Sequence, residues 1–174
     1  MKKVYFAIIL LFFFLQSSFV PAVAGGWFGL NLLLAAVVSL SLLFDFEENI
    51  IWIFLAGILF ESFSSSFFGI GMISFLAAAF FVFLFKRVFL AEEKQLFIGF
   101  LVIALAKIFF DGTFLALSAF FDIVSQTPVH FWQGLSLGGY LWEMFWFVLM
   151  AGLVHWIMAG IKDRFNYKFK EIKV

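Results

Sequence analysis

The chain has 174 residues, of which 66% are apolar and 13% charged, whereas an ordinary soluble domain is about 45–50% apolar and about 25% charged. A chain of this size leaves much of its side-chain area at the surface, so this composition excludes a water-soluble globule and requires a surface that faces lipid. It also excludes intrinsic disorder. The 11 basic and 11 acidic residues balance, so the net charge does not indicate a nucleic-acid partner, and the lack of Cys excludes disulfides and thiolate sites.

The apolar residues occur in long unbroken runs, which indicate helices rather than the alternating strands of a membrane barrel. A helix needs about 20 mainly apolar residues to cross the hydrocarbon of a bilayer. We therefore predict an all-α integral membrane protein with a single transmembrane domain over residues 1–174. The predicted helices are residues 4–23, 28–44, 50–63, 68–85, 96–120 and 137–161, and residues 162–174 form a basic cytoplasmic tail. The third helix is short, so five helices are the alternative.

The N-terminal segment has two interpretations. Lys2 and Lys3, the apolar run and the Ala-Val-Ala at residues 22–24 resemble the three regions of a cleavable secretory signal. The run that starts at Val4, however, is about 20 residues long and contains Gln16, which suits a full membrane span. We expect the segment to be retained as the first helix.

The positions of Lys and Arg predict the orientation, because these residues are held on the cytoplasmic side when they lie in short loops. With six crossings, the loops around Gly25, Ser65 and Gln126 contain neither residue, and both termini are cytoplasmic. Five crossings would break this pattern. The acidic segment at residues 45–49, interpreted as a loop, does not contradict it because acids contribute little. The basic residues on the cytoplasmic face are Lys2, Lys3, Lys86, Arg87, Lys94, Lys162, Arg164, Lys168, Lys170 and Lys173.

Four ionisable residues fall inside predicted helices: Glu61, Lys107, Asp111 and Glu143. Each would cost at least about 2.5–3.5 kcal/mol at mid-membrane, so each should face other helices and find a partner. A rise of about 1.5 Å per residue places the three acids roughly 9–12 Å below the outer surface and Lys107 near the middle. Lys107 and Asp111 lie one turn apart and can pair along one helix face. We predict that the four residues share a polar pocket.

This pocket has two possible roles. It could bind a proton, a ligand or a partner, or it could be a polar clamp that fixes the order of the helices, supported by Gln16, Asn31 and the serines. The clamp is favoured because a proton pump would carry further acids or a His in line, and His155 lies toward the cytoplasmic end of its helix. Two separate His residues without Cys disfavour a zinc site.

Catalytic motifs are missing from the sequence. It contains no Gly-rich phosphate loop, no His-Glu-x-x-His and no Gly-x-Ser-x-Gly. The acidic pairs at residues 47–48 and 92–93 resemble the paired glutamates of membrane prenyl-proteases but lack the Arg that follows three residues later, and are interpreted as solvated loop charges. We therefore expect neither an enzyme nor a bound cofactor or metal.

Short polar motifs separate the apolar runs in a fixed order. A Leu-Gln-Ser near the end of the first helix is followed by a proline, and an asparagine precedes a run of leucines in the second. A glycine, an acid and a serine close the third helix before a Phe-Gly. An aspartate lies in the fifth helix, and the sixth contains tryptophan and has a basic end (residues 142–164). The motif residues are Gln16, Ser17, Pro21, Asn31, Gly57, Glu61, Ser64, Phe68, Gly69 and Asp111.

This order and spacing resemble the bacterial rod-shape-determining MreD family over nearly the whole chain. In that family the first helix closes in Leu-Gln-(Ser)-x-x-x-Pro, and the second begins with Pro-Asp or Pro-Asn before a Leu-rich run. Its most specific segment is Gly-x-x-x-Asp-x-x-Ser followed by Leu/Phe-Gly. The chain departs from this pattern where Leu30 stands in place of a common Pro, Glu61 replaces Asp, and Glu143 stands where Pro is frequent.

The resemblance implies a non-catalytic, multi-pass scaffold of the bacterial cytoplasmic (inner) membrane that serves cell elongation, rod shape and lateral peptidoglycan synthesis. The partners it implies are a bitopic MreC-like protein and, through it, the actin-like MreB filament and the peptidoglycan synthases. Membrane lipid is a further partner, and nucleic acid is not expected.

The alternative function is the substrate-binding membrane subunit of a vitamin or other micronutrient uptake transporter, which also has six helices. Such subunits often carry Ala-x-x-x-Ala on the first helix, so that another helix can pack closely. Here residues 6–14 are mostly bulky and include three successive phenylalanines. The first helix therefore favours the scaffold.

Overall fold

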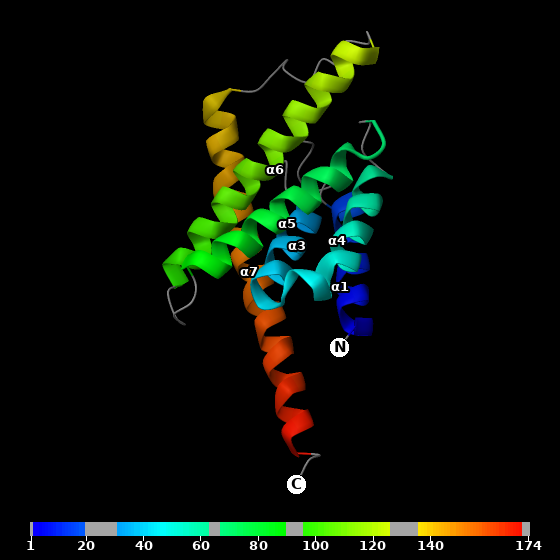
Figure 1. Cartoon of the computed structure of the whole chain (residues 1–174). Coiled ribbons are helices and arrows are strands. Elements are labelled where there is room, and N and C mark those ends of the chain that lie inside the picture. Colours follow the sequence, from blue (N-terminus) through cyan, green and yellow to red (C-terminus); the bar gives the residue numbers. More distant parts are fainter. Residues whose placement is uncertain (1, 20–30, 63–66, 90–95, 126–135, 172–174) are drawn as a thin grey trace.

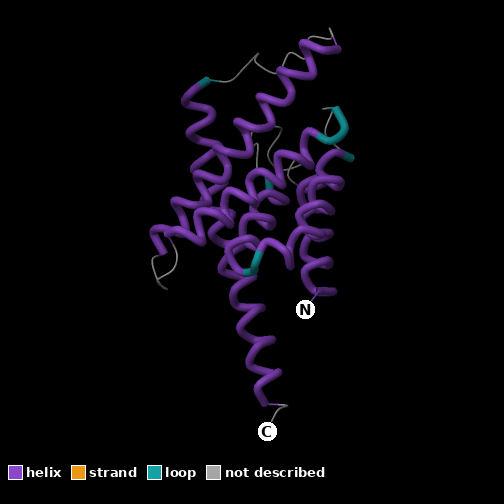
Figure 2. Tube along the Cα trace, in the orientation of Figure 1, coloured by secondary structure: helices purple, strands orange, loops and turns teal. Residues whose placement is uncertain are grey.

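The computed structural model describes residues 2–19, 31–62, 67–89, 96–125 and 136–171, and all of its secondary structure is helical (Figures 1 and 2). This confirms the all-α fold class. The elements are α1 (Lys2–Phe14), the π-helical turn η1 (Leu15–Phe19), α3 (Leu32–Leu43), α4 (Phe46–Glu61), α5 (Ile70–Phe89), α6 (Leu96–Ser125) and α7 (Leu137–Glu171).

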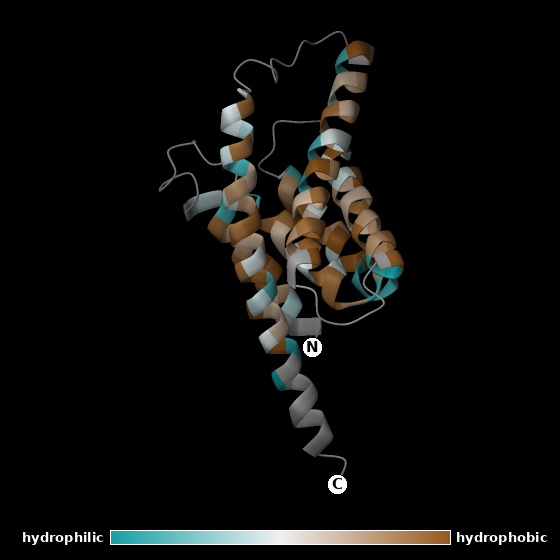
Figure 3. Cartoon of the chain, turned by 90° about the vertical axis from the view of Figure 1, so that its left-hand side faces the viewer, coloured by the Kyte–Doolittle hydropathy of each residue, from teal (hydrophilic) through white to brown (hydrophobic). Residues whose placement is uncertain are grey.

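Within the described residues, three helices are long and apolar enough to cross a membrane, over Ile70–Val88 in α5, Ile98–Ile123 in α6 and Leu137–Lys162 in α7. Shorter apolar helices cover Tyr5–Ser18 and Leu32–Leu43. Many large apolar side chains lie on the outside, and Phe68, Ile123, Leu137 and Trp156 are each more than 70% exposed. Figure 3 shows that hydrophobic residues predominate along the helices. These features indicate a membrane-associated protein with transmembrane-type helices.

The short helix α3 is the centre of the bundle. It contacts α1, α4, α5, α6 and α7, and residues 33–41 are all buried. Its small residues, such as Ala35 and Ala36, let the surrounding helices approach closely. The buried hydroxyls of Ser39 and Ser41 donate to the carbonyls of Ala35 and Val37, at 2.7 and 2.9 Å, so they need no outside partner. Its 12 residues extend about 18 Å, less than the hydrocarbon thickness.

The connection between α3 and α4 is shorter than the acidic loop expected at residues 45–49. Helix α4 begins at Phe46, so Glu47 and Glu48 are exposed in its first turn rather than in a loop. Acids are stabilised there because the N-terminal end of a helix carries partial positive charge. Asn49 is buried and donates from Nδ2 to the carbonyls of Leu40 (3.0 Å) and Asp45 (3.2 Å), which ties α4 to α3.

Other helix ends also differ from the expected positions. Helix α5 continues to Phe89 and carries Lys86 and Arg87 in its last turn, where cations are favoured by the helix dipole. Helix α6 runs to Ser125. Helix α7 runs to Glu171, so most of the expected tail is helical, and its C-terminal end projects beyond the other helices (Figures 1 and 2). Residues 20–23 and 28–30 of the first two expected helices lie outside the described residues.

Candidate functional site

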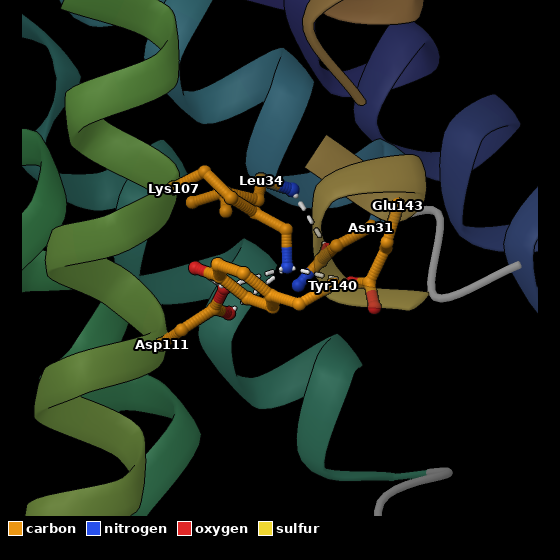
Figure 4. A network of polar contacts seen from close by, with 6 residues as sticks. All are labelled: Asn31, Leu34, Lys107, Asp111, Tyr140 and Glu143. Atoms are coloured by element: carbon orange, nitrogen blue, oxygen red, sulfur yellow. Dashed lines mark hydrogen bonds and ion pairs between the residues drawn. The ribbon is translucent and has the colours of Figure 1, made fainter. Parts of the chain in front are cut away.

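A network of charged side chains joins α6 to α7 around the ammonium group of Lys107 (Figure 4). Lys107 Nζ donates to both carboxylate oxygens of Asp111, at 3.0 and 2.8 Å, and to Oε1 of Glu143 at 2.8 Å. The Tyr140 hydroxyl donates to Oδ2 of Asp111 at 3.0 Å. The network thus brings together three of the four acids and bases predicted to share a pocket.

Helical spacing places these four side chains. Lys107 and Asp111 are four residues apart on α6, and Tyr140 and Glu143 are three residues apart on α7, so each pair lies on one face of its helix. The Lys107 ammonium also lies 5.7 Å from the centre of the Phe147 ring, one turn beyond Glu143. Tyr140 was not identified from the sequence, although its spacing from Glu143 placed it on the same face.

The network provides an acceptor for each hydrogen of the Lys107 ammonium group, but this single cation does not balance the charge of two carboxylates. Lys107 is only 4% exposed, and its three donor hydrogens match three carboxylate oxygens. Two carboxylates face one ammonium, which leaves one negative charge in excess when both are ionised. The side chains of Asp111 and Glu143 are 20% and 28% exposed, so the network borders the outside of the bundle on its acidic side.

Glu61 instead binds backbone N–H groups at the start of the next helix, α5. Its Oε1 accepts from the backbone N–H groups of Gly69 (2.7 Å) and Met72 (3.1 Å), at the N-terminal end of α5. A carboxylate is favoured there because the first N–H groups of a helix lack backbone partners. Among the described residues, no hydrogen bond or ion pair joins Glu61 to Lys107, Asp111 or Glu143. Oε2 of Glu61 is buried and has no hydrogen-bond partner there.

Two glycines of the same motif have structural roles. Gly69 has φ of +101°, a conformation that L side chains rarely adopt, in the turn that presents its N–H to Glu61. At Gly57 an added Cβ would lie 2.7 Å from the Cα of Met72, so the close crossing of α4 and α5 requires a residue without a side chain. Ser64 lies outside the described residues.

Two further motif residues, Gln16 and Asn31, hold the N-terminal end of α3. Asn31 is its N-cap and accepts from the Leu34 N–H at 2.9 Å, while Gln16 of η1 accepts from the Leu33 N–H at 3.0 Å. These bonds satisfy two of the four N–H groups that a helix leaves without backbone partners. Ser17 donates to the Phe14 carbonyl in its own turn, at 3.3 Å.

A second lysine site lies at the opposite end of α3. Lys162 of α7 donates from Nζ to the Leu43 carbonyl at 2.6 Å and lies 4.7 Å from the centre of the Phe44 ring. Lys86 of α5 donates to the Phe44 carbonyl at 3.2 Å and lies 3.9 Å from a carboxylate oxygen of Asp45. The last carbonyls of a helix lack backbone partners and carry partial negative charge, so two cations stabilise this end. The sequence indicated these lysines only as markers of orientation.

His155 of α7 lies between Glu143 and Lys162 in the sequence, and its Nδ1 is buried with no hydrogen-bond partner among the described residues. Among all the residues that the structure describes, no three His, Asp or Glu side chains are grouped so that they could hold a metal ion. His130 is not among the described residues.

Comparison with known proteins adds no further assignment. No family model, curated protein or solved structure matches the chain. The function is therefore argued from the residues and their contacts.

Proposed function

We propose that the chain is a non-catalytic scaffold of the bacterial cytoplasmic membrane that serves cell elongation and lateral peptidoglycan synthesis, as its resemblance to MreD implies. The observation that carries the proposal is the use of the motif side chains. Gln16, Asn31 and Glu61 each accept hydrogen bonds from the first N–H groups of a helix. Side chains committed to holding helix ends suit a protein whose task is to present a fixed surface to partners.

The outer surface agrees with this role. Large apolar side chains, including Leu141, Trp142 and Phe145 of α7, are more than half exposed. In a bilayer such a surface contacts lipid or the transmembrane helices of other proteins. The proposed partners are an MreC-like bitopic protein and, through it, the MreB filament and the peptidoglycan synthases.

We also propose six crossings with both termini in the cytoplasm. Lys86 and Lys162 donate to adjacent carbonyls at the end of α3, so the basic ends of α5 and α7 lie at the same end of the bundle. Basic residues near helix ends are held on the cytoplasmic side. The two contacts therefore support one cytoplasmic face that contains these helix ends.

The topology can be tested cleanly because the chain has no Cys. Single cysteines are placed at the exposed positions Arg87, Arg164 and Ser136. A membrane-impermeant maleimide should label Ser136→Cys in intact spheroplasts, and Arg87→Cys and Arg164→Cys only after permeabilisation. Labelling of Arg164→Cys in intact spheroplasts would contradict a cytoplasmic C-terminus.

The cellular role is tested by depleting the protein in a rod-shaped host. Depletion should produce rounder cells and reduced insertion of lateral wall, and a plasmid copy of the chain should restore both. Unchanged rods with normal wall insertion would contradict the proposal. A stoichiometric vitamin in native mass spectra of the purified protein would support the uptake-transporter subunit instead.

A further inference from the structure

We propose that Glu143 binds a Lys or Arg side chain carried by the transmembrane helix of a partner, which lies against α6 and α7 beside the Lys107 network. This inference deepens the scaffold proposal, since it names the chemistry by which the partner is recognised. It rests on that proposal for the existence of a membrane partner.

The first observation is the charge that the network leaves unmatched. Lys107 occupies Oε1 of Glu143, and among the described residues Oε2 accepts no hydrogen bond. The Glu143 side chain is 28% exposed, so it can be reached from outside the bundle. A partly exposed carboxylate at membrane depth is costly without a partner, and a basic side chain would supply both the charge and the donors.

The second observation is the depth of the site. Glu143 is six residues after Leu137, the start of the apolar span of α7, which places it about 9 Å along the helix from that end. A basic side chain on a transmembrane helix can extend over this depth, whereas a lipid headgroup remains at the interface. The depth therefore favours a partner helix over a lipid amine.

The third observation is the open surface next to Glu143. Gly139 lies one turn before Glu143 on the same face of α7 and is exposed, and an added Cβ there would meet only the Ser136 hydroxyl, at 3.0 Å. Small residues at a surface let another transmembrane helix approach closely. A basic residue on such a helix would meet a carboxylate whose Oε2 accepts no hydrogen bond from the described residues.

The test uses the purified full-length chain in phosphatidylcholine vesicles with synthetic transmembrane peptides as the probe. One Leu/Ala peptide carries a single Arg about 9 Å from its outer end, and its matched control carries Gln at the same position. Association is measured by energy transfer between dyes on the peptide and the protein. We expect the Arg peptide to bind at least about tenfold more tightly, the ratio that corresponds to about 1.4 kcal/mol.

The variant Glu143→Gln should abolish the preference for Arg. Gln keeps the side-chain length and an oxygen that can accept from Lys107, so the network contact is retained while the charge is lost. The matched control is Glu48→Gln, which removes an exposed acid from the first turn of α4 and should leave the preference unchanged. Helix content by circular dichroism and a single gel-filtration peak establish that both variants fold.

A second variant keeps the inference testable if Glu143→Gln fails to fold. Gly139→Leu places a bulky side chain on the exposed surface next to Glu143, and should weaken binding of the Arg peptide several-fold by blocking its close approach. Equal binding of the Arg and Gln peptides to the unmodified chain would overturn the inference. So would an unchanged preference in folded Glu143→Gln.

The outcome is independent of the cell-shape experiment. If depletion leaves rods unchanged while the Arg peptide binds through Glu143, the cell-elongation role fails and the recognition site stands. If depletion rounds the cells while the Arg and Gln peptides bind equally, the scaffold stands and the recognition site fails.

Discussion

The two lysine sites of the bundle bind lysine ammonium groups through different kinds of partner. Lys107 is bound by the side-chain carboxylates of Asp111 and Glu143, whereas Lys162 and Lys86 are bound by backbone carbonyls at the end of α3. In the first site each partner carries a full charge. In the second the hydrogen-bond partners are carbonyls that carry only the partial charges of a helix end, and the Asp45 carboxylate lies farther away, 3.9 Å from Lys86. The consequence of losing the lysine should therefore differ strongly between the two sites.

The contacts at the two ends of α3 explain how so short a helix can lie inside the bundle. A buried helix leaves N–H groups unsatisfied at one end and carbonyls at the other. Gln16 and Asn31 supply acceptors at the first end, and Lys86 and Lys162 supply donors at the second. Three of these four residues belong to other elements, so the ends of α3 also fix the positions of η1, α5 and α7.

The largest effect is expected from Lys107→Met. The substitution keeps an unbranched chain of similar length but leaves two partly buried carboxylates without a cation, and removing one partner of a buried ion pair costs about 3–5 kcal/mol. The free energy of unfolding in detergent micelles titrated with SDS measures it. The triple variant Lys107→Met/Asp111→Asn/Glu143→Gln should regain most of the loss, because no unpaired charge remains. A loss below about 1 kcal/mol in the single variant would contradict the role of Lys107 as the counter-charge.

A smaller effect is expected from Lys162→Met. The partly buried Leu43 carbonyl loses its hydrogen bond to a charged donor, which costs about 1.5–3 kcal/mol, but no charge is stranded. The same unfolding assay measures the change. The matched control is Arg164→Met, an exposed residue on the same helix, which should change the free energy by no more than about 0.5 kcal/mol. Equal effects of the two substitutions would show that the carbonyl contact contributes nothing.

The two sites also differ in how far the sequence predicted them. Lys107 and Asp111 are one turn apart, so their pairing follows from helical spacing alone. The contact of Glu143 with Lys107 was predictable because the two residues lie at similar depths along their helices. Depth along a helix gives height but not direction around the bundle. Glu61 is predicted at the same height, yet its Oε1 accepts from N–H groups at the start of the helix that follows it in the chain.

The sequence contains no pattern that predicts the contacts of Lys86 and Lys162 with the C-terminal end of α3. Lys162 and Leu43 are 119 residues apart, and the acceptor is a backbone carbonyl, which every residue possesses. The acids at Glu47 and Glu48 were interpreted as loop charges because they interrupt an apolar run. They lie in a first helical turn instead, since that position accommodates acids without requiring burial.

Tyr140→Phe should distinguish a supporting hydrogen bond from the charge contacts within the first site. The substitution removes one donor from Oδ2 of Asp111 and keeps the ring, while Lys107 still binds the same oxygen. Polar contacts between membrane helices contribute about 0.6 kcal/mol on average, so we expect a loss of this size. A double-mutant cycle with Asp111→Asn isolates the coupling. Additive effects of the two substitutions would contradict a direct contribution from the bond.

The smallest effect is expected from Lys86→Met, within the same α3 end as Lys162. The Lys86 side chain is 29% exposed and its acidic neighbour Asp45 is 80% exposed, at a separation of 3.9 Å, so water can replace much of what the ammonium provides. An exposed ion pair contributes about 0–1 kcal/mol, and water can reach the Phe44 carbonyl once the ammonium is gone. We therefore expect a loss below about 0.5 kcal/mol in the unfolding assay. If Lys86→Met instead cost as much as Lys162→Met, the end of α3 would be a dry site in which both cations matter equally, and solvent access would not be what separates the two lysines.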